Sequence, residues 1–370
     1  MEDELRRLRA QVRRVDAELQ RVIRRRLRLA LAIGKTKRSR GQPLRDYSIE
    51  REVVRRWRSG LATAGVQGGR AEDLARWMVE ESVRVQDSLG PIPEMKTAGT
   101  DALVVGGAGG MGTWLASFLH AVGHRVAILD PAADGPSHAG FPVRTDLSEA
   151  AAEAGLVAVT TPMRVAPAVY RELWRTGTKA VVFDVLSVKA PLIPWIRRGV
   201  REGFQVGSIH PLFGPAVRSL TGRNLLVVDC GVPEANRRIE GLFSKSSVKV
   251  SRIPLRHHDP WMVDALALPH AVSLAFGLAL GPGLGTSGPR SDRVPTSFLR
   301  QAEAARVVSR ENPELSFDIQ SLNPHVAPMY ARLEKSLRQL RRAVEKEGPM
   351  EYRRLMRRVA ARFPGESRSP

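Results

Sequence analysis

Cysteine is nearly absent from this sequence, since Cys230 is the only one among its 370 residues. A single thiol excludes an intramolecular disulfide, and with it the small secreted scaffolds that disulfides hold together. The N-terminus lacks the apolar core of a signal peptide, and we expect no membrane span, which would need roughly 18 apolar residues. We therefore expect a cytoplasmic protein without a membrane partner.

Aromatic residues are scarce as well, at 5%, and acidic residues are outnumbered by basic ones, so that the formal charge is +20. Residues 1–58 carry +11 of this excess, and a basic arm that binds nucleic acid is therefore one alternative. However, arginines continue along every later segment, and no aromatic residues interleave with the N-terminal arginines to stack on bases. The pattern favours a protein without a nucleic-acid partner.

The remaining composition, 43% hydrophobic, is typical of a globular chain with two or three domains. Helical periods dominate up to residue 90, short β-rich runs alternate with helices up to about 254, and helical periods then return. The expected fold is multi-domain, with an all-α three-helix module, a Rossmann-like α/β parallel sheet and an all-α dimerisation domain. The expected bounds are 1–90 for the helical module, 91–100 for a linker, 101–254 for the α/β domain, 255–363 for the C-terminal helices and 364–370 for a tail.

The first helix carries a heptad-like apolar seam in which residues recur at steps of three and four, namely Leu5, Leu8, Val12, Val15, Leu19 and Val22. Arg26 stands where the seam should continue, so its guanidinium must either meet an anion or reach solvent. Lys37 lies eleven residues on, about three turns, and points the same way. A second helix is expected to begin at an N-cap near Ser48, and a third to span 70–89. The first helix is too long for these two to cover, which predicts an intertwined dimer.

Several short motifs then make residues 1–90 resemble the all-helical chorismate mutases. They are Leu8-Arg9, Arg25-Arg26-Leu27, Gly34-Lys35-Thr36-Lys37, Arg51-Glu52 and the pair Ser82 and Gln86. The resemblance implies that Arg9 (across the dimer), Arg26 and Arg51 hold the two carboxylates of chorismate. It implies that Lys37 and Gln86 donate to the ether oxygen, and that Glu52 and Ser82 complete the lining.

Conversion of chorismate to prephenate is a pericyclic rearrangement, which needs orientation and charge stabilisation rather than a nucleophile. One position departs from the family pattern, which has an aspartate three residues before the Arg-Glu pair. Ser48 stands there and Asp46 lies two residues earlier, so either a short insertion shifts Asp46 or Ser48 takes the role. A helical module that dimerises without catalysing is the alternative.

A dinucleotide site is indicated by a buried strand at 101–106 that runs into a glycine-rich turn and a helix, followed by a second strand that ends at Asp130. Such glycines let the backbone approach a pyrophosphate at the helix N-terminus, and the acid binds the ribose hydroxyls. No Arg or Lys follows directly to hold a 2′-phosphate, so NAD is expected rather than NADP. The expected cofactor-binding residues are Gly107, Gly109, Gly110, Met111, Gly112 and Asp130.

Two further motifs follow predicted strands, where a doubly wound sheet places its ligand crevice. Asp184-Val-Leu-Ser187-Val-Lys189 ends one strand and His210 ends another. A histidine beside a nicotinamide is well suited as a general base, because imidazole titrates near neutrality. A structural His-Pro pair is the alternative.

Residues 101–360 also resemble the prephenate dehydrogenases. The motifs that carry this are the Gly107 turn, Asp184-x-x-Ser187-x-Lys189, His210-Pro-x-Phe-Gly-Pro, His258-Asp259, Leu268-Pro-His270 and Phe298-Leu-Arg300. The resemblance implies that His210 takes the proton from the ring hydroxyl of prephenate while hydride leaves for NAD and the ring carboxylate departs as carbon dioxide. It implies that Ser187 orients this transfer, that Arg300 holds a carboxylate and that His270 gives a polar contact. Lys189 either serves the site or faces solvent.

Together the two resemblances imply a bifunctional enzyme of tyrosine biosynthesis that makes prephenate and oxidises it to 4-hydroxyphenylpyruvate. It would be a homodimer with small-molecule substrates, and no cluster of His, Cys and acids suggests a metal site. The alternatives are a dehydrogenase that uses arogenate, another Rossmann oxidoreductase with a non-catalytic helical module, and a basic nucleic-acid-binding protein.

Overall fold

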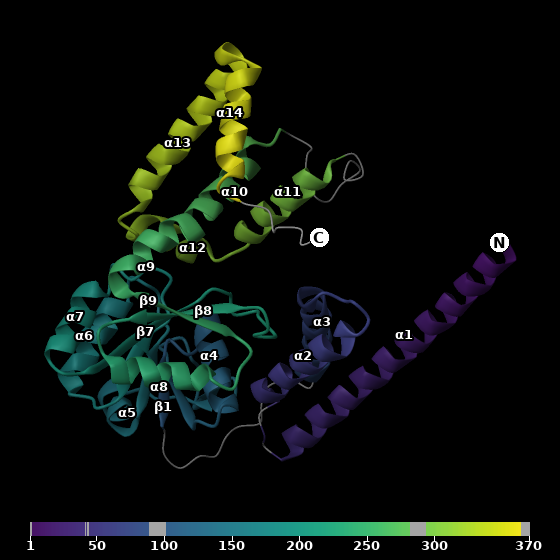
Figure 1. Ribbon diagram of the computed structural model, residues 1–370. Coiled ribbons are helices and arrows are strands. Elements are labelled where there is room, and N and C mark those ends of the chain that lie inside the picture. Colours follow the sequence, from purple (N-terminus) through teal and green to yellow (C-terminus); the bar gives the residue numbers. More distant parts are fainter. Residues whose placement is uncertain (1, 41, 43, 89–100, 282–293, 364–370) are drawn as a thin grey trace. The chain divides into compact units, whose positions relative to one another are not determined.

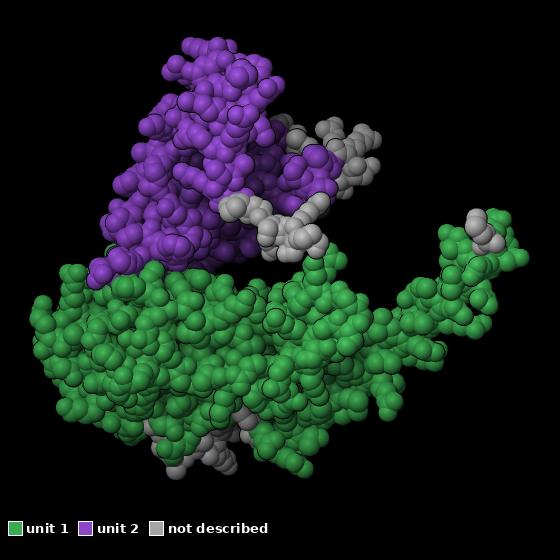
Figure 2. All heavy atoms as spheres, viewed as in Figure 1, with its two compact units in different colours: residues 1–255 green, residues 256–370 purple. Residues whose placement is uncertain are grey.

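A computed structural model describes residues 2–40, 42, 44–88, 101–281 and 294–363. The chain forms two compact units, residues 1–255 and 256–370 (Figure 2). The first contains the helical module and the α/β domain, and the second is helical. The expected linker at 91–100 and the expected tail at 364–370 lie outside the described residues.

The helical module consists of α1 (Glu2–Ser39), α2 (Tyr47–Ala62) and α3 (Gly68–Asp87) (Figure 1). Only Ala30 and Gly34 of α1 are buried. The reason is length, because α1 has 38 residues whereas α2 has 16 and α3 has 20, too few to cover it. The predicted apolar seam is exposed over its whole length, at Leu5, Leu8, Val12, Val15, Leu19 and Val22. Inside the module, Val53 of α2 packs against Val79 and Val83 of α3.

The second helix begins at Tyr47, and its N-cap is Asp46 rather than Ser48. The Asp46 carboxylate accepts hydrogen bonds from the backbone N–H groups of Ser48 and Ile49, which the first turn of a helix leaves without partners. The Ser48 hydroxyl also donates to this carboxylate, at 2.6 Å. The expectation of an N-cap near Ser48 was therefore wrong by two residues, because both residue types are good caps and the earlier one is used.

The α/β domain is built on a seven-stranded sheet in the order β2-β1-β5-β6-β7-β8-β9. Its strands are β1 (Ala102–Val105), β2 (Val126–Leu129), β5 (Leu156–Val159), β6 (Val181–Asp184), β7 (Gln205–Pro211), β8 (Asn224–Asp229) and β9 (Lys249–Pro254). A separate two-stranded sheet pairs β3 (Ser137–His138) with β4 (Phe141–Pro142). The strands of the large sheet are parallel except that β7 and β8 run antiparallel. This departs from the expected parallel sheet because no crossover helix lies between β7 and β8, and parallel neighbours require one.

Helices between the strands cover the sheet, namely α4 (Gly110–Ala121), α5 (Leu147–Glu153), α6 (Ala166–Thr176), α7 (Ile193–Arg201) and α8 (Pro233–Phe243). One core cluster joins Trp114 and Phe118 of α4 to Phe243 of α8 and to the buried strand residues. Tyr47 of α2 belongs to the same cluster, and its ring centroid lies 5.1 Å from that of Phe118. The helical module therefore contributes a buried aromatic side chain to the core of the α/β domain.

The second unit is entirely helical in its described residues. It contains α9 (Leu255–Met262), α10 (Leu268–Ala279), α11 (Thr296–Val308), α12 (Pro313–Leu322), α13 (Val326–Arg342) and α14 (Pro349–Ala360), with π-helical turns at Val263–Ala267 and Ala343–Glu347. The continuous run Leu255–Ala279 is, among the described residues, the one helix long and apolar enough to cross a membrane by length and composition alone. It contains the buried pair His258 and Asp259, whose Nδ1 and Oδ1 atoms lie 2.7 Å apart.

Candidate active sites

The glycine-rich turn between β1 and α4 is shaped by close packing at two of its glycines. A Cβ atom on Gly107 would lie 2.4 Å from the Ile128 side chain, and one on Gly112 would lie 2.1 Å from the Gly106 carbonyl oxygen. Both residues must therefore be glycine for α4 to approach the sheet. Gly109 differs, because a Cβ there would meet nothing closer than 3.4 Å. The exposed face of Gly109 thus has room for a ligand.

Asp130 lies directly after β2 and faces this turn. Its Oδ2 accepts a hydrogen bond from the Ala108 N–H at 3.0 Å, and its Oδ1 accepts one from the Ala132 N–H at 2.9 Å. The carboxylate is thereby fixed beside the glycine turn, where the ribose of a dinucleotide is bound in Rossmann folds. The hydroxyl of Thr161, just after β5, is buried without a hydrogen-bond partner in the described residues. A glycine cradle, a fixed acid and an unpartnered hydroxyl suit a dinucleotide.

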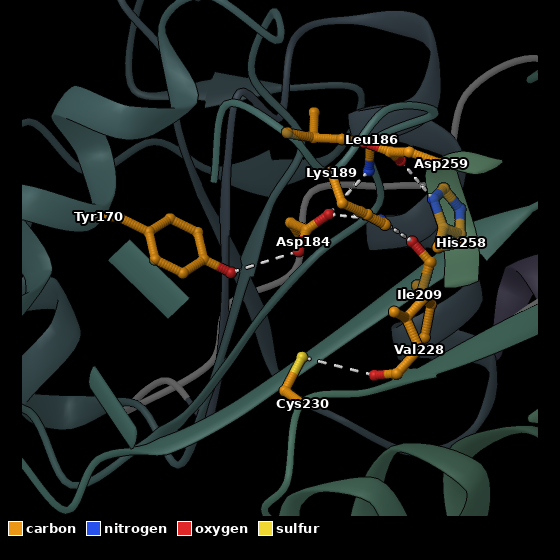
Figure 3. A network of polar contacts seen from close by, with 9 residues as sticks. All are labelled: Tyr170, Asp184, Leu186, Lys189, Ile209, Val228, Cys230, His258 and Asp259. Atoms are coloured by element: carbon orange, nitrogen blue, oxygen red, sulfur yellow. Dashed lines mark hydrogen bonds and ion pairs between the residues drawn. The ribbon is translucent and has the colours of Figure 1, made fainter. Parts of the chain in front are cut away.

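A buried polar network lies at the ends of β6 and β7 (Figure 3). Lys189 and Asp184 are both 0% exposed, and Lys189 Nζ donates to Asp184 Oδ1 at 2.6 Å. Lys189 therefore does not face solvent. The same ammonium donates to the Ile209 carbonyl at 2.7 Å, one residue before His210. His210 itself is 3% exposed, and Ser187 is half-buried on the segment that follows β6.

In the second unit, His270 of α10 is 8% exposed. Its Nδ1 has no hydrogen-bond partner among the described residues, and the nearest carboxylate oxygen, Glu311 Oε2, is 3.7 Å away. Glu311 had not been predicted, because nothing in its local sequence distinguishes it from other surface acids. Arg300 lies on α11 with its side chain exposed.

The helical module brings together three of its predicted site residues. Arg26 Nη1 donates to the Ser82 hydroxyl at 2.6 Å and to the Met78 carbonyl at 3.1 Å, and Gln86 Nε2 donates to the Ala30 carbonyl at 3.0 Å. The Arg26 acceptors are neutral, and burial together with nearby Arg56 lowers the pKa of Arg26. A cavity of about 530 Å³ adjoins this guanidinium and is lined by Arg26, Val53, Arg56, Trp57, Gly60 and Leu61. The charged side chains of this lining are Arg26 and Arg56, and the other lining residues are apolar.

Lys37 lies beside two acids that had not been assigned to the site. Its Nζ donates to the Leu44 carbonyl at 3.2 Å, and its charge acts on both Asp46 and Glu50. Burial works to raise the pKa of Asp46, but the hydrogen bonds from Ser48 and Ile49 and the charge of Lys37 lower it overall. Burial raises the pKa of Glu50 to about 7, against the opposing effect of Arg45.

Arg51, Glu52 and Arg9 lie apart from these groups. Arg51 Nη1 donates to the Ser244 carbonyl after α8, at 2.7 Å, and Glu52 forms an ion pair with Arg56 at 3.7 Å. Arg9 is exposed on the N-terminal half of α1. The structure thus places Asp46 and Glu50, and not Arg51 and Glu52, next to Lys37. Asp46 itself could have identified this pair of acids, because aspartate is a good helix cap and Asp46 lies two residues before Ser48.

Comparisons with known proteins agree with both halves of the chain. Residues 8–87 match the family described as chorismate mutase type II. The chain is 32% identical over 254 residues to the 4-amino-4-deoxyprephenate dehydrogenase of Streptomyces pristinaespiralis. The aligned residues cover 66% of this chain and 84% of that protein. The chain is 29% identical over 286 residues to the T-protein of Haemophilus influenzae, covering 74% of this chain and 69% of that protein. The fold resembles that of prephenate dehydrogenase from Aquifex aeolicus, with a TM-score of 0.57, 18% identity and coverage of 72% of this chain and 98% of that one.

The fold and the two sites define an enzyme that joins a chorismate mutase region to a dinucleotide-dependent dehydrogenase, an isomerase with an oxidoreductase. The chain belongs to the prephenate dehydrogenase family.

Proposed function

We propose that this protein converts chorismate to prephenate in its helical module and oxidatively decarboxylates prephenate to 4-hydroxyphenylpyruvate in its dehydrogenase domains. The observation that carries the proposal is the presence in one chain of a chorismate mutase type II region and a dehydrogenase with the glycine turn, Asp130 and His210. The two reactions form a sequence, because the product of the first is the substrate of the second. Such a sequence belongs to tyrosine biosynthesis.

In the mutase reaction a flexible dianion must be folded into its reactive shape while negative charge grows on the ether oxygen. Arg26 is proposed to hold a carboxylate, and Lys37 and Gln86 to donate to the ether oxygen, with Ser82 beside Arg26. Arg51 and Glu52 are weaker candidates, because their contacts lie with Ser244 and Arg56. Asp46 and Glu50 are proposed to take the place of Glu52 near Lys37.

In the dehydrogenase reaction, bound NAD would supply the acceptor for the hydride that leaves the ring carbon bearing the hydroxyl. Gly107, Gly109, Gly110, Met111 and Gly112 would hold its pyrophosphate, and Asp130 its ribose hydroxyls. His210 takes the proton from the ring hydroxyl, and Ser187 orients this transfer. Loss of the ring carboxylate as carbon dioxide then makes the ring aromatic, which drives the reaction. Arg300 and His270 are proposed to bind the substrate, on the strength of the motifs that contain them.

The proposed assembly is a cytoplasmic homodimer with bounds of 1–90, 101–254 and 255–363 for its three domains. The exposed seam of α1 supports the dimer, because six large apolar side chains in a row are costly to leave in water. A second copy that covers this seam would also bring its Arg9 to the mutase site.

A second candidate is a dehydrogenase for a prephenate analogue with an amino group. The relative from Streptomyces pristinaespiralis, named for 4-amino-4-deoxyprephenate, favours this candidate. The ring carbon that bears the amine can equally lose a hydride, with NAD as the acceptor when bound, and departure of the ring carboxylate as carbon dioxide then leaves an aromatic ring that keeps its amino group. Arogenate, in which the side-chain keto group is an amine, is another analogue to test.

The test is to incubate the purified protein with chorismate and NAD and to follow chorismate loss and NADH formation together. Both signals are expected in the wild type, and His210→Asn should lower the rate of NADH formation by roughly 100- to 10,000-fold while chorismate is still consumed. One other outcome is that chorismate is consumed without NADH formation. If 4-amino-4-deoxyprephenate or arogenate then restores NADH formation, that compound replaces prephenate in the proposal. If NADP is reduced instead, NADP replaces NAD. Inertness toward chorismate and every prephenate analogue would refute it.

A further inference from the structure

Asp184 and Lys189 form an ion pair that is fully removed from solvent. Both side chains are 0% exposed, and the pair is short, at 2.6 Å. Burying two charges costs several kcal/mol per ion, and a well-packed apolar pair is often equally stable. Stability alone is therefore a poor account of this pair, and the other atoms that it contacts become informative.

One of those contacts is the Tyr170 hydroxyl, which donates to Asp184 Oδ2 at 3.5 Å, and two others lie on the segments that carry the proposed proton-transfer residues. Asp184 Oδ1 accepts the Leu186 N–H at 3.0 Å, which fixes the backbone one residue before Ser187. Lys189 Nζ donates to the Ile209 carbonyl at 2.7 Å, which fixes the backbone one residue before His210 (Figure 3). The pair thus ties the segment after β6 to the end of β7.

The sheet alone leaves this end of β7 weakly held on the β6 side. The pairing of β6 with β7 ends at Asp184 opposite Ser208, and the strand partner of His210 is Leu226 of β8, on the other side. The Lys189 hydrogen bond to Ile209 continues the connection between β6 and β7 beyond the last paired residue.

We propose that Asp184 and Lys189 are positioning residues, which set the place of His210 relative to Ser187 without touching substrate or cofactor. This inference rests on the proposed function, in which His210 is the base. Misplacement of a reacting group by about 1 Å can cost on the order of 100-fold in rate. The pair therefore acts on kcat through His210, and not on substrate affinity.

The test uses the neutral double variant Asp184→Asn/Lys189→Met. The side-chain amide oxygen of the Asp184→Asn substitution still accepts from the Leu186 N–H, so the main loss is the Lys189 hydrogen bond to Ile209. We expect kcat for NADH formation to fall roughly 10- to 100-fold, with KM for prephenate and Kd for NAD changed by less than about 3-fold. Thr178→Val is the matched control, because it removes a buried hydrogen bond of similar length, 3.0 Å to the Ala151 carbonyl, on the segment that leads into β6. Its kcat should stay within about 2-fold of wild type.

A double-mutant cycle separates positioning from general damage. In a His210→Asn background the neutral pair should cost less than about 2-fold further, since its effect passes through His210. An equal loss in both backgrounds, or a kcat within about 3-fold of wild type, would overturn the inference. If the double variant does not fold, Lys189→Arg is used in its place. This substitution keeps a positive charge beside Asp184 but moves the donor of the hydrogen bond to the Ile209 carbonyl, and the same double-mutant cycle with His210→Asn applies. Full NADH formation by His210→Asn alone would instead refute the proposed base, whatever the pair does.

Discussion

Glu50 is the residue at which the helical module is most sensitive to pH. It is 7% exposed and accepts a hydrogen bond from Ser219 at 3.3 Å, and burial raises its pKa to about 7. A carboxyl group whose pKa is higher in the folded protein than its ordinary value near 4.5 favours the protonated state there. Its contribution to stability is therefore complete below about pH 4.5 and is lost as the pH rises toward 7 and above.

Glu50→Gln should remove this dependence. The neutral amide stays buried without a charge, so the variant should exceed the wild type in free energy of unfolding at pH 8 by about 2 kcal/mol and match it near pH 5. Urea unfolding at both pH values measures the difference. Glu52→Gln is the control, because that side chain is 43% exposed and should leave the pH dependence intact. A wild type that gains stability between about pH 5 and pH 8, in parallel with Glu50→Gln, would contradict the assignment.

Asp130 is the residue that is proposed to select NAD over NADP. Asp130→Asn keeps the hydrogen bonds to the Ala108 and Ala132 N–H groups partly satisfied but removes the negative charge that repels a 2′-phosphate. We expect Kd for NAD to rise roughly 10-fold and Kd for NADP to fall, because each tenfold change corresponds to about 1.4 kcal/mol, within the range of one charged hydrogen bond. Asp134→Asn, at a nearby position, is the control that should change neither value. Unaltered NAD affinity in Asp130→Asn would remove this residue from the site.

At the scale of elements, the glycine turn offers a test that separates fold from ligand. Gly112→Ala places a Cβ 2.1 Å from the Gly106 carbonyl oxygen and should lower the melting temperature by several degrees or prevent folding. Gly109→Ala meets nothing closer than 3.4 Å, so its melting temperature without cofactor should stay within about 2 °C of wild type. Its Kd for NAD should nevertheless rise about 10-fold or more, because the methyl group occupies the approach of the pyrophosphate. Unchanged NAD binding by Gly109→Ala would place the cofactor elsewhere.

Elements with a strong local pattern could be predicted from the sequence, and those decided by distant contacts could not. The buried strand expected at 101–106 contains β1 (Ala102–Val105), because a run of buried β-formers has few other solutions. The antiparallel pairing of β7 with β8 was missed, since it depends on a connection without a helix rather than on either strand's residues.

The candidate sites show the same division. The roles of the glycines and Asp130 follow from a local turn, and the structure places them together. Lys189 was left between a site role and a solvent role, because its partners, Asp184 and Ile209, meet it only when β6 and β7 pair. In the helical module the family motif implied Arg51 and Glu52, whereas the structure has Asp46 and Glu50 near Lys37, a proximity that depends on how α1 and α2 pack.

At the scale of the whole molecule, the helical module and the α/β domain lie in one compact unit. Tyr47 is 4% exposed within the aromatic core of the α/β domain, and Glu50 accepts from Ser219. In addition, Arg51 donates to the Ser244 carbonyl, and Glu80 forms an ion pair with Arg223 at 3.7 Å. These contacts join residues of α2 and α3 to several segments of the α/β domain, so the two should unfold together.

Cofactor binding should therefore stabilise the mutase module as well. At about 100 times its Kd, NAD adds about 2.7 kcal/mol to the stability of the state that binds it. In the wild type, amide hydrogen exchange of the buried residues Val79 and Val83 in α3 should slow by up to about 100-fold when NAD is added. Tyr47→Ala removes the aromatic contact with Phe118, at a cost of about 3–5 kcal/mol, and should uncouple α3 from NAD while the α/β domain still binds it. Trp77→Ala, on an exposed position of α3, is the control that should keep the coupling. If the rate of amide hydrogen exchange in α3 of the wild type is the same with and without NAD, the helical module opens independently of the α/β domain.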